Sequence, residues 1–296
     1  MSILIDADTK VVMQGLGSRT GEFHCQEMLD YGTKIVAGVS PGKGGQSVLG
    51  IPLFNTVKDA VAATGATASM ITVPPPTAAD AIMEAVDSGI TVAVSVTDGI
   101  PAQDMIKVKR YMRMYRSERR MRLIGPNCSG IVNPGKILLG IMPSAIYTDG
   151  NIGIVSRSGT LGYEAALQIA EQGLGVSSSI GIGGDPIVGS TFHDILQLFE
   201  ADDDTHAVVL IGEIGGPQEA DAARYISESM NKPVVAYVAG RGTRRNQTMG
   251  HAGAIISAFG DSADEKQQIL RNSGAHIAPL PSEIGATVVA ALGAGS

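Results

Sequence analysis

The chain has 296 residues, about twice the length that serves as a soft prior for one domain, so two domains with a large core are expected. No apolar run reaches the roughly 18 to 20 residues that span a bilayer, so we expect no membrane partner. The net charge is −7 and basic residues are mixed with acidic ones, which excludes a broad nucleic-acid-binding surface. The exception is the basic segment from Lys107 to Arg122, whose helical spacing predicts a solvated helix face.

The beginning of the chain and its cysteines indicate its compartment. MSILIDADTK has no basic stretch followed by an apolar one, and it is not Arg-rich like an organellar transit peptide. Cys25 and Cys128 are too few for a disulfide framework and lack the spacing of a zinc site. We therefore expect a cytoplasmic protein with reduced thiols and no metal site.

Short β-branched runs alternate with amphipathic stretches along almost the whole chain, which is typical of βαβ units around parallel sheets. The predicted fold class is α/β, with two doubly wound halves at residues 1–148 and 149–296. Between Gly125 and Gly150 the periodicity disappears into a stretch rich in Pro and Gly, so we place the domain boundary near its end. Strands are predicted at 10–14, 34–39, 68–73, 91–95, 122–124, 152–156, 176–180, 207–211, 234–237 and 276–278.

The first predicted strand runs into a glycine turn, GLGSRTG at residues 15–21, whose backbone N–H groups favour an anion. A dinucleotide site would place Asp or Glu at the end of the second strand to hold a ribose hydroxyl. The sequence there is VSPGKGG, and its Lys43 suits a phosphorylated nucleotide carrier better than NAD, with a flexible basic loop as the alternative. Thr97 and Asp98 follow the fourth strand, at the edge where open α/β sheets bind ligands, although they also suit a helix cap.

Three motifs of the second half indicate phosphoryl chemistry. SRSGT, at residues 156–160, lies at a strand-to-helix turn and forms either an anion cradle or a simple Ser/Thr cap. His251 lies among glycines and small residues that leave room for an adduct, although such a His is often structural. Glu213 ends a predicted strand, and a carboxylate can bind one ring nitrogen and leave the other nucleophilic. We predict that Glu213 and His251 act as one unit.

Together these motifs resemble the alpha subunit of succinate-CoA ligase and its close relatives over nearly the whole chain. They are, in order, the glycine turn, PGKGG, TDGIP, GPNCSG, SRSGTL, GIGGDP, IGEIGG and MGHAGAI. The resemblance implies a Rossmann-like CoA-binding domain at 1–148 and a flavodoxin-like, doubly wound ligase domain at 149–296. It implies an ADP-forming acid-thiol ligase in which a phosphohistidine passes its phosphoryl group to an acid, and CoA attacks the acyl phosphate.

The resemblance also implies partners and residue roles. ATP or GTP with Mg would be bound by a separate ATP-grasp beta subunit, in an αβ or α2β2 assembly. His251 would be phosphorylated with the support of Glu213. The phosphohistidine would lie against the helix that starts at Ser158, Gly159 and Thr160, with Tyr163 near the dicarboxylic acid substrate. CoA would contact Gly17, Ser18, Arg19, Thr20, Lys43, Val96, Thr97 and Asp98.

Several departures from the succinate pattern resemble malate-CoA ligase of serine-cycle bacteria. Gly162 replaces Thr, IMPSAIY replaces IMPGHIH, and the segment around residues 112–120 is several residues longer. Gly162 removes a β-branched side chain beside the substrate helix, which would admit the extra hydroxyl of malate. We therefore predict the alpha subunit of a malate-CoA ligase, with the succinate-CoA ligase alpha subunit of the citric acid cycle as the alternative.

Two alternatives of other classes are disfavoured by particular residues. A non-catalytic CoA-binding regulatory protein would not need IGEIGG paired with MGHAGAI, and a nicotinamide dehydrogenase would need an acidic residue after the second strand. Two further departures, Gly17-Ser18 in the glycine turn and RGTRRNQ at residues 241–247, predict local differences in the CoA turn and in the loop that carries His251.

Overall fold

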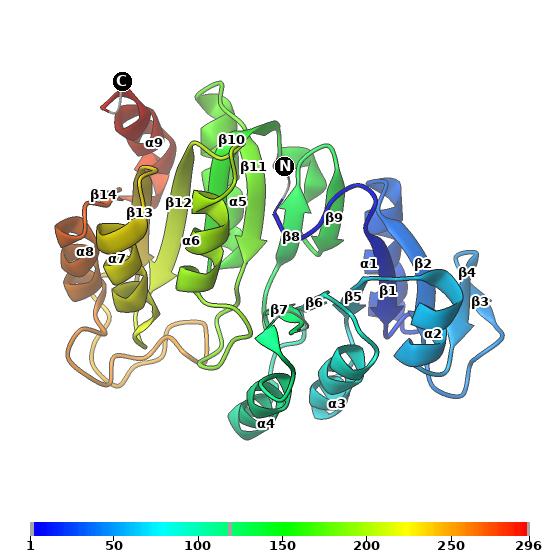
Figure 1. Ribbon diagram of the computed structural model, residues 1–296. Helices are drawn as coiled ribbons and strands as arrows, with labels where there is room; N and C mark the ends of the chain where they lie inside the picture. Colours follow the sequence, from blue (N-terminus) through cyan, green and yellow to red (C-terminus); the bar gives the residue numbers. More distant parts are fainter. Residues whose placement is uncertain (1–2, 118–119, 295–296) are drawn as a thin grey trace.

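The computed structural model of the protein describes residues 3–117 and 120–294. Glu118 and Arg119, which belong to the long segment noted around residues 112–120, lie outside the described residues. The described chain forms two sheets of seven strands each (Figure 1). Both sheets are dominated by parallel pairing between helical layers, as the α/β prediction requires.

The first sheet is built from the N-terminal residues. Its strand order is β3 (Ser47–Val48), β4 (Ile51–Phe54), β2 (Lys34–Val39), β1 (Lys10–Gln14), β5 (Ala68–Ile71), β6 (Val92–Ser95) and β7 (Arg122–Ile124). Pairing is parallel from β4 to β7, and the short β3 pairs antiparallel with β4. The helices are α1 (Arg19–Asp30), α2 (Val57–Thr64), α3 (Pro75–Asp87) and α4 (Ala102–Met112).

The alternation of side chains along these strands covers both faces of the first sheet. Val12 and Ile71 pack in one apolar cluster with residues of α2, α3 and α4. Met13 and Met70, their neighbours in sequence, pack on the other face with α1 and with the core of the second half. Both faces are therefore buried, which explains why these strands read as continuous apolar runs.

The second sheet follows the same plan. Its order is β14 (His276–Ile277), β13 (Val234–Ala239), β12 (Ala207–Glu213), β10 (Asp149–Ser156), β11 (Val176–Gly181), β8 (Gly130–Asn133) and β9 (Ile137–Gly140). Within the layers, α6 (Phe192–Glu200) packs beside α7 (Gln218–Ser229), and α5 (Gly159–Glu171) packs beside α9 (Ile284–Gly293). Helix α8 (Ala263–Asn272) packs on β13 and α7. No helix in residues 3–117 and 120–294 is long and apolar enough to cross a membrane.

The stretch between Gly125 and Gly150, predicted to lack periodic structure, contains the hairpin β8–β9. All eight strand residues are buried, so the alternation of polar and apolar residues that would have revealed a strand is missing. Strand β8 pairs antiparallel with β11, and Thr33 of the first half donates to the carbonyl of Leu138 at 2.6 Å. The hairpin thus forms the edge of the second sheet that faces the first half (Figure 1), and the boundary at 148/149 stays a prediction.

Candidate functional site

His251 lies in the long loop between β13 and α8. The loop turns tightly there, because the amide of Ala254 donates to the carbonyl of His251 at 3.1 Å and the amide of Met249 donates to the carbonyl of Ala254 at 3.0 Å. The imidazole rests on the backbone of Gly184, where an added Cβ would lie 2.2 Å from the ring Cγ. A glycine at 184 is therefore required by the position of the ring. Gly184 belongs to the sequence motif GIGGDP.

Glu213 orients the imidazole from the last position of β12. Its Oε2 lies 2.7 Å from Nδ1 of His251. The carboxylate side chain is 5% exposed, whereas the imidazole is 28% exposed. Among the described residues, no hydrogen bond is made to Nε2 of His251. The predicted pairing of Glu213 with His251 is thus seen as a direct contact. It uses Nδ1 of the ring, and Nε2 lies on the side of the ring away from Glu213.

The contact sets the proton affinity of the ring. The hydrogen bond that Glu213 accepts from the ring raises the pKa of His251 above its usual value, and this effect outweighs the opposing effect of burial. Arg157 also lowers the pKa, whereas the more distant Asp185 raises it. The imidazole therefore accepts a proton more readily than an isolated histidine, which links its nucleophilicity to pH.

Glu213 is held in turn by a buried network of charges that sequence reasoning missed. Its Oε1 lies 3.0 Å from Nη2 of Arg157, and Nη1 of Arg157 lies 3.6 Å from Oε1 of Glu219. Nζ of Lys266 lies 2.5 Å from Oε2 of Glu219 and donates to the carbonyls of Glu213 and Gly215. All four side chains are at most 5% exposed. The two positive charges of Arg157 and Lys266 balance the two negative charges of the carboxylates. The net charge of the network is therefore zero without His251.

Arg157 joins this network to the start of α5. It directly precedes Ser158, the N-cap of α5, whose Oγ accepts from the amide of Leu161 at 3.4 Å and lies 3.3 Å from Oγ1 of Thr160. Tyr163 lies one turn further, with its hydroxyl 3.3 Å from the position of a Cβ on Gly159, and burial raises its pKa. Within the described residues, no hydrogen bond joins His251 to these side chains. The structure places both groups around Arg157.

The predicted CoA residues of the glycine turn lie at the carboxyl edge of the first sheet. Ser18 caps α1 by accepting from the amide of Gly21 at 3.0 Å, and Arg19 and Thr20 are exposed in its first turn. Nζ of Lys43 donates to the carbonyl of Gly17 at 3.2 Å. A Cβ on Gly17 would lie 3.3 Å from that Nζ and would fill the space between the two loops. The cradle therefore suits an anion at a helix N-terminus with a cation beside it.

The third group of predicted CoA residues connects the two halves. Val96, Thr97 and Asp98 follow β6, and the amide of Asn127 donates to the carbonyl of Thr97 at 2.9 Å. The carbonyl of Asn127 accepts from the amide of Gly184 at 3.2 Å, on which the imidazole of His251 rests.

A cavity of about 170 Å³ lies next to this connection. Asp98 of the first half and Ala252, the neighbour of His251, both line it. Asp98, the last of the predicted CoA residues, and the His251 loop thus border the same cavity.

Comparisons with known proteins place the chain in a family. Residues 6–99 match the CoA binding domain family, and residues 155–276 match the CoA-ligase family. The chain is 58% identical to the malate-CoA ligase alpha subunit of Methylorubrum extorquens, over 97% of both chains. The chain belongs to the CoA-ligase alpha subunits. This alpha subunit is also 51% identical to the ADP-forming succinate-CoA ligase alpha subunit of Aquifex aeolicus, over 97% of this chain and 94% of that one.

Solved structures show that the fold extends to larger enzymes. An ATP citrate lyase from Methanosaeta concilii, in complex with citryl-CoA, matches 99% of this alpha subunit with a TM-score of 0.87 and 24% identity. A dinucleotide-forming acetyl-CoA synthetase from Korarchaeum cryptofilum matches 92% with a TM-score of 0.72 and 21% identity. The alpha subunit spans 51% and 58% of those two chains. At these identities the likeness concerns the fold alone.

Proposed function

We propose that this alpha subunit belongs to a malate-CoA ligase that forms malyl-CoA from malate, CoA and ATP, with His251 as the phosphoryl carrier. The 2.7 Å contact between Nδ1 of His251 and Glu213 carries the proposal. A proton on Nδ1 is held by the carboxylate, so the lone pair of the ring lies on Nε2. The 58% identity to a malate-CoA ligase alpha subunit supports the choice of acid.

The chemistry divides one condensation into three steps. Nε2 of His251 attacks the γ-phosphorus of the nucleotide, the bond to the bridging oxygen breaks, and ADP leaves. Glu213 stabilises the positive charge that develops on the ring, because its carboxylate accepts the Nδ1 proton in a hydrogen bond. A carboxylate oxygen of malate then attacks the phosphorus and releases neutral His251. The thiolate of CoA attacks the acyl carbon, and inorganic phosphate leaves.

The remaining site residues are proposed to hold the reactants. The N-terminal turn of α5, with Ser158, Gly159 and Thr160, stabilises the phosphohistidine charge, and Tyr163 contacts the acid. CoA binds along Gly17–Thr20, Lys43 and Val96–Asp98, because the glycine turn and Lys43 form an anion cradle and Asp98 lines a cavity that the His251 loop also borders. ATP or GTP with Mg is bound by an ATP-grasp beta subunit, with which this chain forms an αβ or α2β2 assembly.

Thioester formation by the chain reconstituted with its beta subunit tests the proposal. With ATP and CoA held constant, we expect a higher kcat/KM for malate than for succinate. A higher kcat/KM for succinate would contradict the choice of malate and assign the chain to the citric-acid-cycle reaction. Absence of thioester with either acid, despite CoA binding, would contradict the ligase function itself.

Gly162 offers a test of how malate is selected. It is buried, and an added Cβ would lie 3.5 Å from Cβ and 3.7 Å from Oγ of Ser156, which are ordinary contacts. The fold therefore tolerates a Cβ at 162, and the further atoms of a threonine side chain would lie close to the Ser156 hydroxyl, which accepts from the amide of Ser158 at 3.1 Å. We expect Gly162→Thr to lower the malate-to-succinate ratio of kcat/KM about tenfold. Gly162→Ala is the matched control with a smaller expected shift; an unchanged ratio in Gly162→Thr would refute this role.

Glu213→Gln should change the pH dependence of phosphorylation. Imidazolium has no lone pair on Nε2, so phosphoryl acceptance falls as the pH drops through the pKa of His251. Glu213 raises that pKa, whereas burial and Arg157 lower it. Without the carboxylate, the acid limb of the rate profile should move to lower pH, and the plateau rate should fall about 10²-fold because the developing charge is less stabilised. The measurement is the rate at which the chain is phosphorylated by labelled ATP and the beta subunit at a series of pH values. The control is Glu228→Gln, which changes an exposed carboxylate. An acid limb that stays in place would contradict the assignment.

A further inference from the structure

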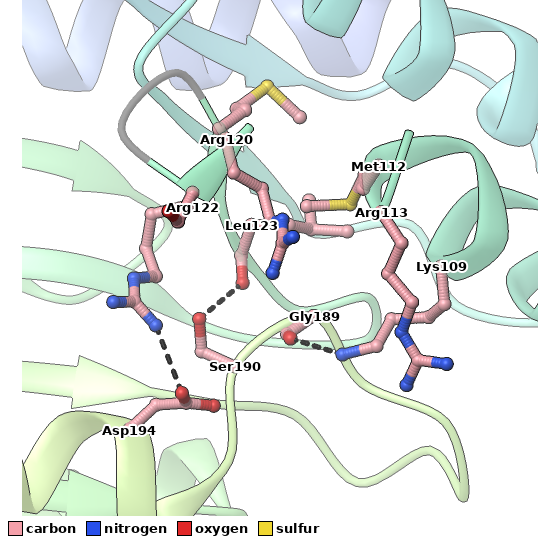
Figure 2. Close-up of a pocket in the computed structure, with 11 residues that line it drawn as sticks. Lys109, Met112, Arg113, Arg120, Arg122, Leu123, Gly189, Ser190 and Asp194 are labelled. Carbon is pink, nitrogen blue, oxygen red and sulfur yellow. Dashed lines mark hydrogen bonds and ion pairs between the residues drawn. The ribbon is translucent and has the colours of Figure 1, made fainter. Parts of the chain in front are cut away.

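A second cavity, of about 360 Å³, lies between the two halves of the chain at the end of α4. We call it the basic cavity and define it by Lys109, Arg113, Arg120, Arg122, Ser190 and Asp194. Figure 2 shows these side chains around one opening, with the cations contributed by the first half and Ser190 and Asp194 by the second. Its volume falls at the lower end of the roughly 300 to 1,000 Å³ of small-molecule sites.

The basic cavity is separate from the candidate CoA site. Ala102 and Met105, at the start of α4, line the smaller cavity near Asp98, whereas Lys109 and Met112, at its end, line the basic cavity. An 11-residue helix such as α4 is roughly 16 Å long. No residue proposed to contact CoA, malate or the phosphohistidine lines the basic cavity.

Charge in the basic cavity is unbalanced in the described structure. Four cations surround it, and Asp194 is the carboxylate that lines it. Asp194 is already engaged, with Oδ1 3.1 Å from Nη1 of Arg122 and Oδ2 accepting from the amide of Thr191 at the start of α6. Among the described residues, Lys109, Arg113 and Arg120 have no carboxylate within ion-pair distance. The whole chain carries a net charge of −7, so this excess of cations is local.

The basic, helically spaced sequence of this segment predicts a solvated helix face. The contacts of Lys109 show that the basic cluster is more than that. Helix α4 ends at Met112, and Nζ of the half-buried Lys109 donates to the carbonyl of Gly189 in the other half at 2.6 Å. Burial lowers the pKa of Lys109; Asp194 opposes that effect, and the nearby arginines add to it. The charge of Lys109 is thus under-compensated in a place that water reaches poorly.

The helix dipole explains only part of the arrangement. Lys109 and Arg113 lie at the C-terminal turn of α4, where cations stabilise the carbonyl end of a helix. Arg120 and Arg122 belong to the next segment and to β7, yet they line the same opening. Like charges brought together repel, and a bound anion would remove that repulsion. The first turn of α6, which begins after Ser190, adds the positive end of a second helix dipole.

We propose that the basic cavity is an anion site for a phosphate group, carried either by inorganic phosphate or by a small phosphate ester. Guanidinium groups present fork-like donors that match phosphate oxygens, and an ammonium adds a point charge. A tetrahedral dianion would neutralise most of the excess charge of Lys109, Arg113 and Arg120. Because Lys109 and the Gly189–Asp194 segment come from different halves, the bound anion would tie the two halves together and raise the melting temperature.

Calorimetric titration of the whole chain tests the proposal, with inorganic phosphate and glycerol 3-phosphate as separate probes. Arg113→Gln/Arg120→Gln should weaken phosphate binding at least about tenfold, since each lost charged hydrogen bond carries about that factor. The matched control, Arg224→Gln/Arg271→Gln, removes two exposed arginines outside the cavity and should leave binding unchanged. The tighter of the two probes identifies the source of the phosphate. Lys109→Gln, a single change, repeats the test if the double variant is unfolded.

Three results would overturn the anion site. The first is equal phosphate affinity in the wild type and in Arg113→Gln/Arg120→Gln. The second is loss of all binding in Ser158→Ala, which would place the phosphate at the start of α5 instead. The third is binding of succinate or malate that is tighter than binding of either phosphate probe and that is lost when Arg120 is replaced. Failure of the ligase proposal would leave these binding results unchanged, because none of them requires turnover.

Discussion

Replacement of His251 by Asn is expected to abolish phosphoryl labelling of the chain when the beta subunit and labelled ATP are supplied. Asn retains a polar side chain of similar reach but has no nucleophilic ring nitrogen. Thioester formation should fall by about 10⁴-fold or more, because loss of a covalent nucleophile removes the whole stepwise route. The label on the wild-type chain should be acid-labile and base-stable, as expected of a phosphoramidate on nitrogen.

The control for this variant is His276→Asn, which changes an exposed histidine in β14. It should retain full labelling and full thioester formation. The backbone of the His251 loop is held by main-chain hydrogen bonds, so the Asn variant should keep the melting temperature of the wild type within a few degrees. Persistent labelling of His251→Asn would remove this residue from the mechanism and direct the search to another nucleophile.

Replacement of Lys266 by Met is expected to destabilise the fold by about 3–5 kcal/mol, the usual cost of removing one partner from a buried ion pair. Lys266 is 1% exposed, and its Nζ donates to the carbonyls of Glu213 and Gly215 as well as to Glu219. Methionine fills a similar volume but leaves both carbonyls without this donor and a carboxylate short of one cation. The measurement is the free energy of unfolding from urea denaturation, with an unchanged m-value.

Lys107→Met is the matched control for Lys266. Lys107 pairs with Asp104 at 2.8 Å on the surface of α4 and is 70% exposed, so its removal should change stability by well under about 1 kcal/mol. The double variant Lys266→Met/Glu219→Leu should recover part of the loss, because it also removes the unpaired carboxylate. Equal destabilisation by the two lysine variants would contradict the network. Loss of labelling in Lys266→Met at a temperature where the variant is folded would further indicate that Glu213 is mispositioned.

The periodic parts of the fold could be predicted because their pattern is local. The predicted strands at residues 10–14, 34–39 and 122–124 coincide with β1, β2 and β7. The hairpin β8–β9 was missed, since it is buried on both faces and its strands pair with residues far away in sequence. The short strands β3 and β4 were also missed. They form an edge ribbon, and β4 consists of four residues and includes Pro52.

Within the site, the motifs themselves indicated His251, Glu213 and the glycine turn, because small residues and strand ends restrict where such chemistry can lie. The buried partners gave no such signal. Lys266 occurs in ADEKQQILRN, a helix whose composition is that of a solvated surface, yet it is among the most buried side chains of the protein. Arg157 appears in the SRSGT motif as one polar residue among others, although its side chain contacts Glu213 rather than solvent.

The sequence by itself therefore determined the α/β class, the family and the pairing of Glu213 with His251, since these depend on local periodicity and on motifs whose residues carry the chemistry. Only the tertiary structure decided which charges balance Glu213, which backbone supports the imidazole, and that four cations from α4, the following segment and β7 line one cavity. Charge compensation and close packing depend on distances between residues that are far apart in the chain, and no local pattern of residue types specifies those distances.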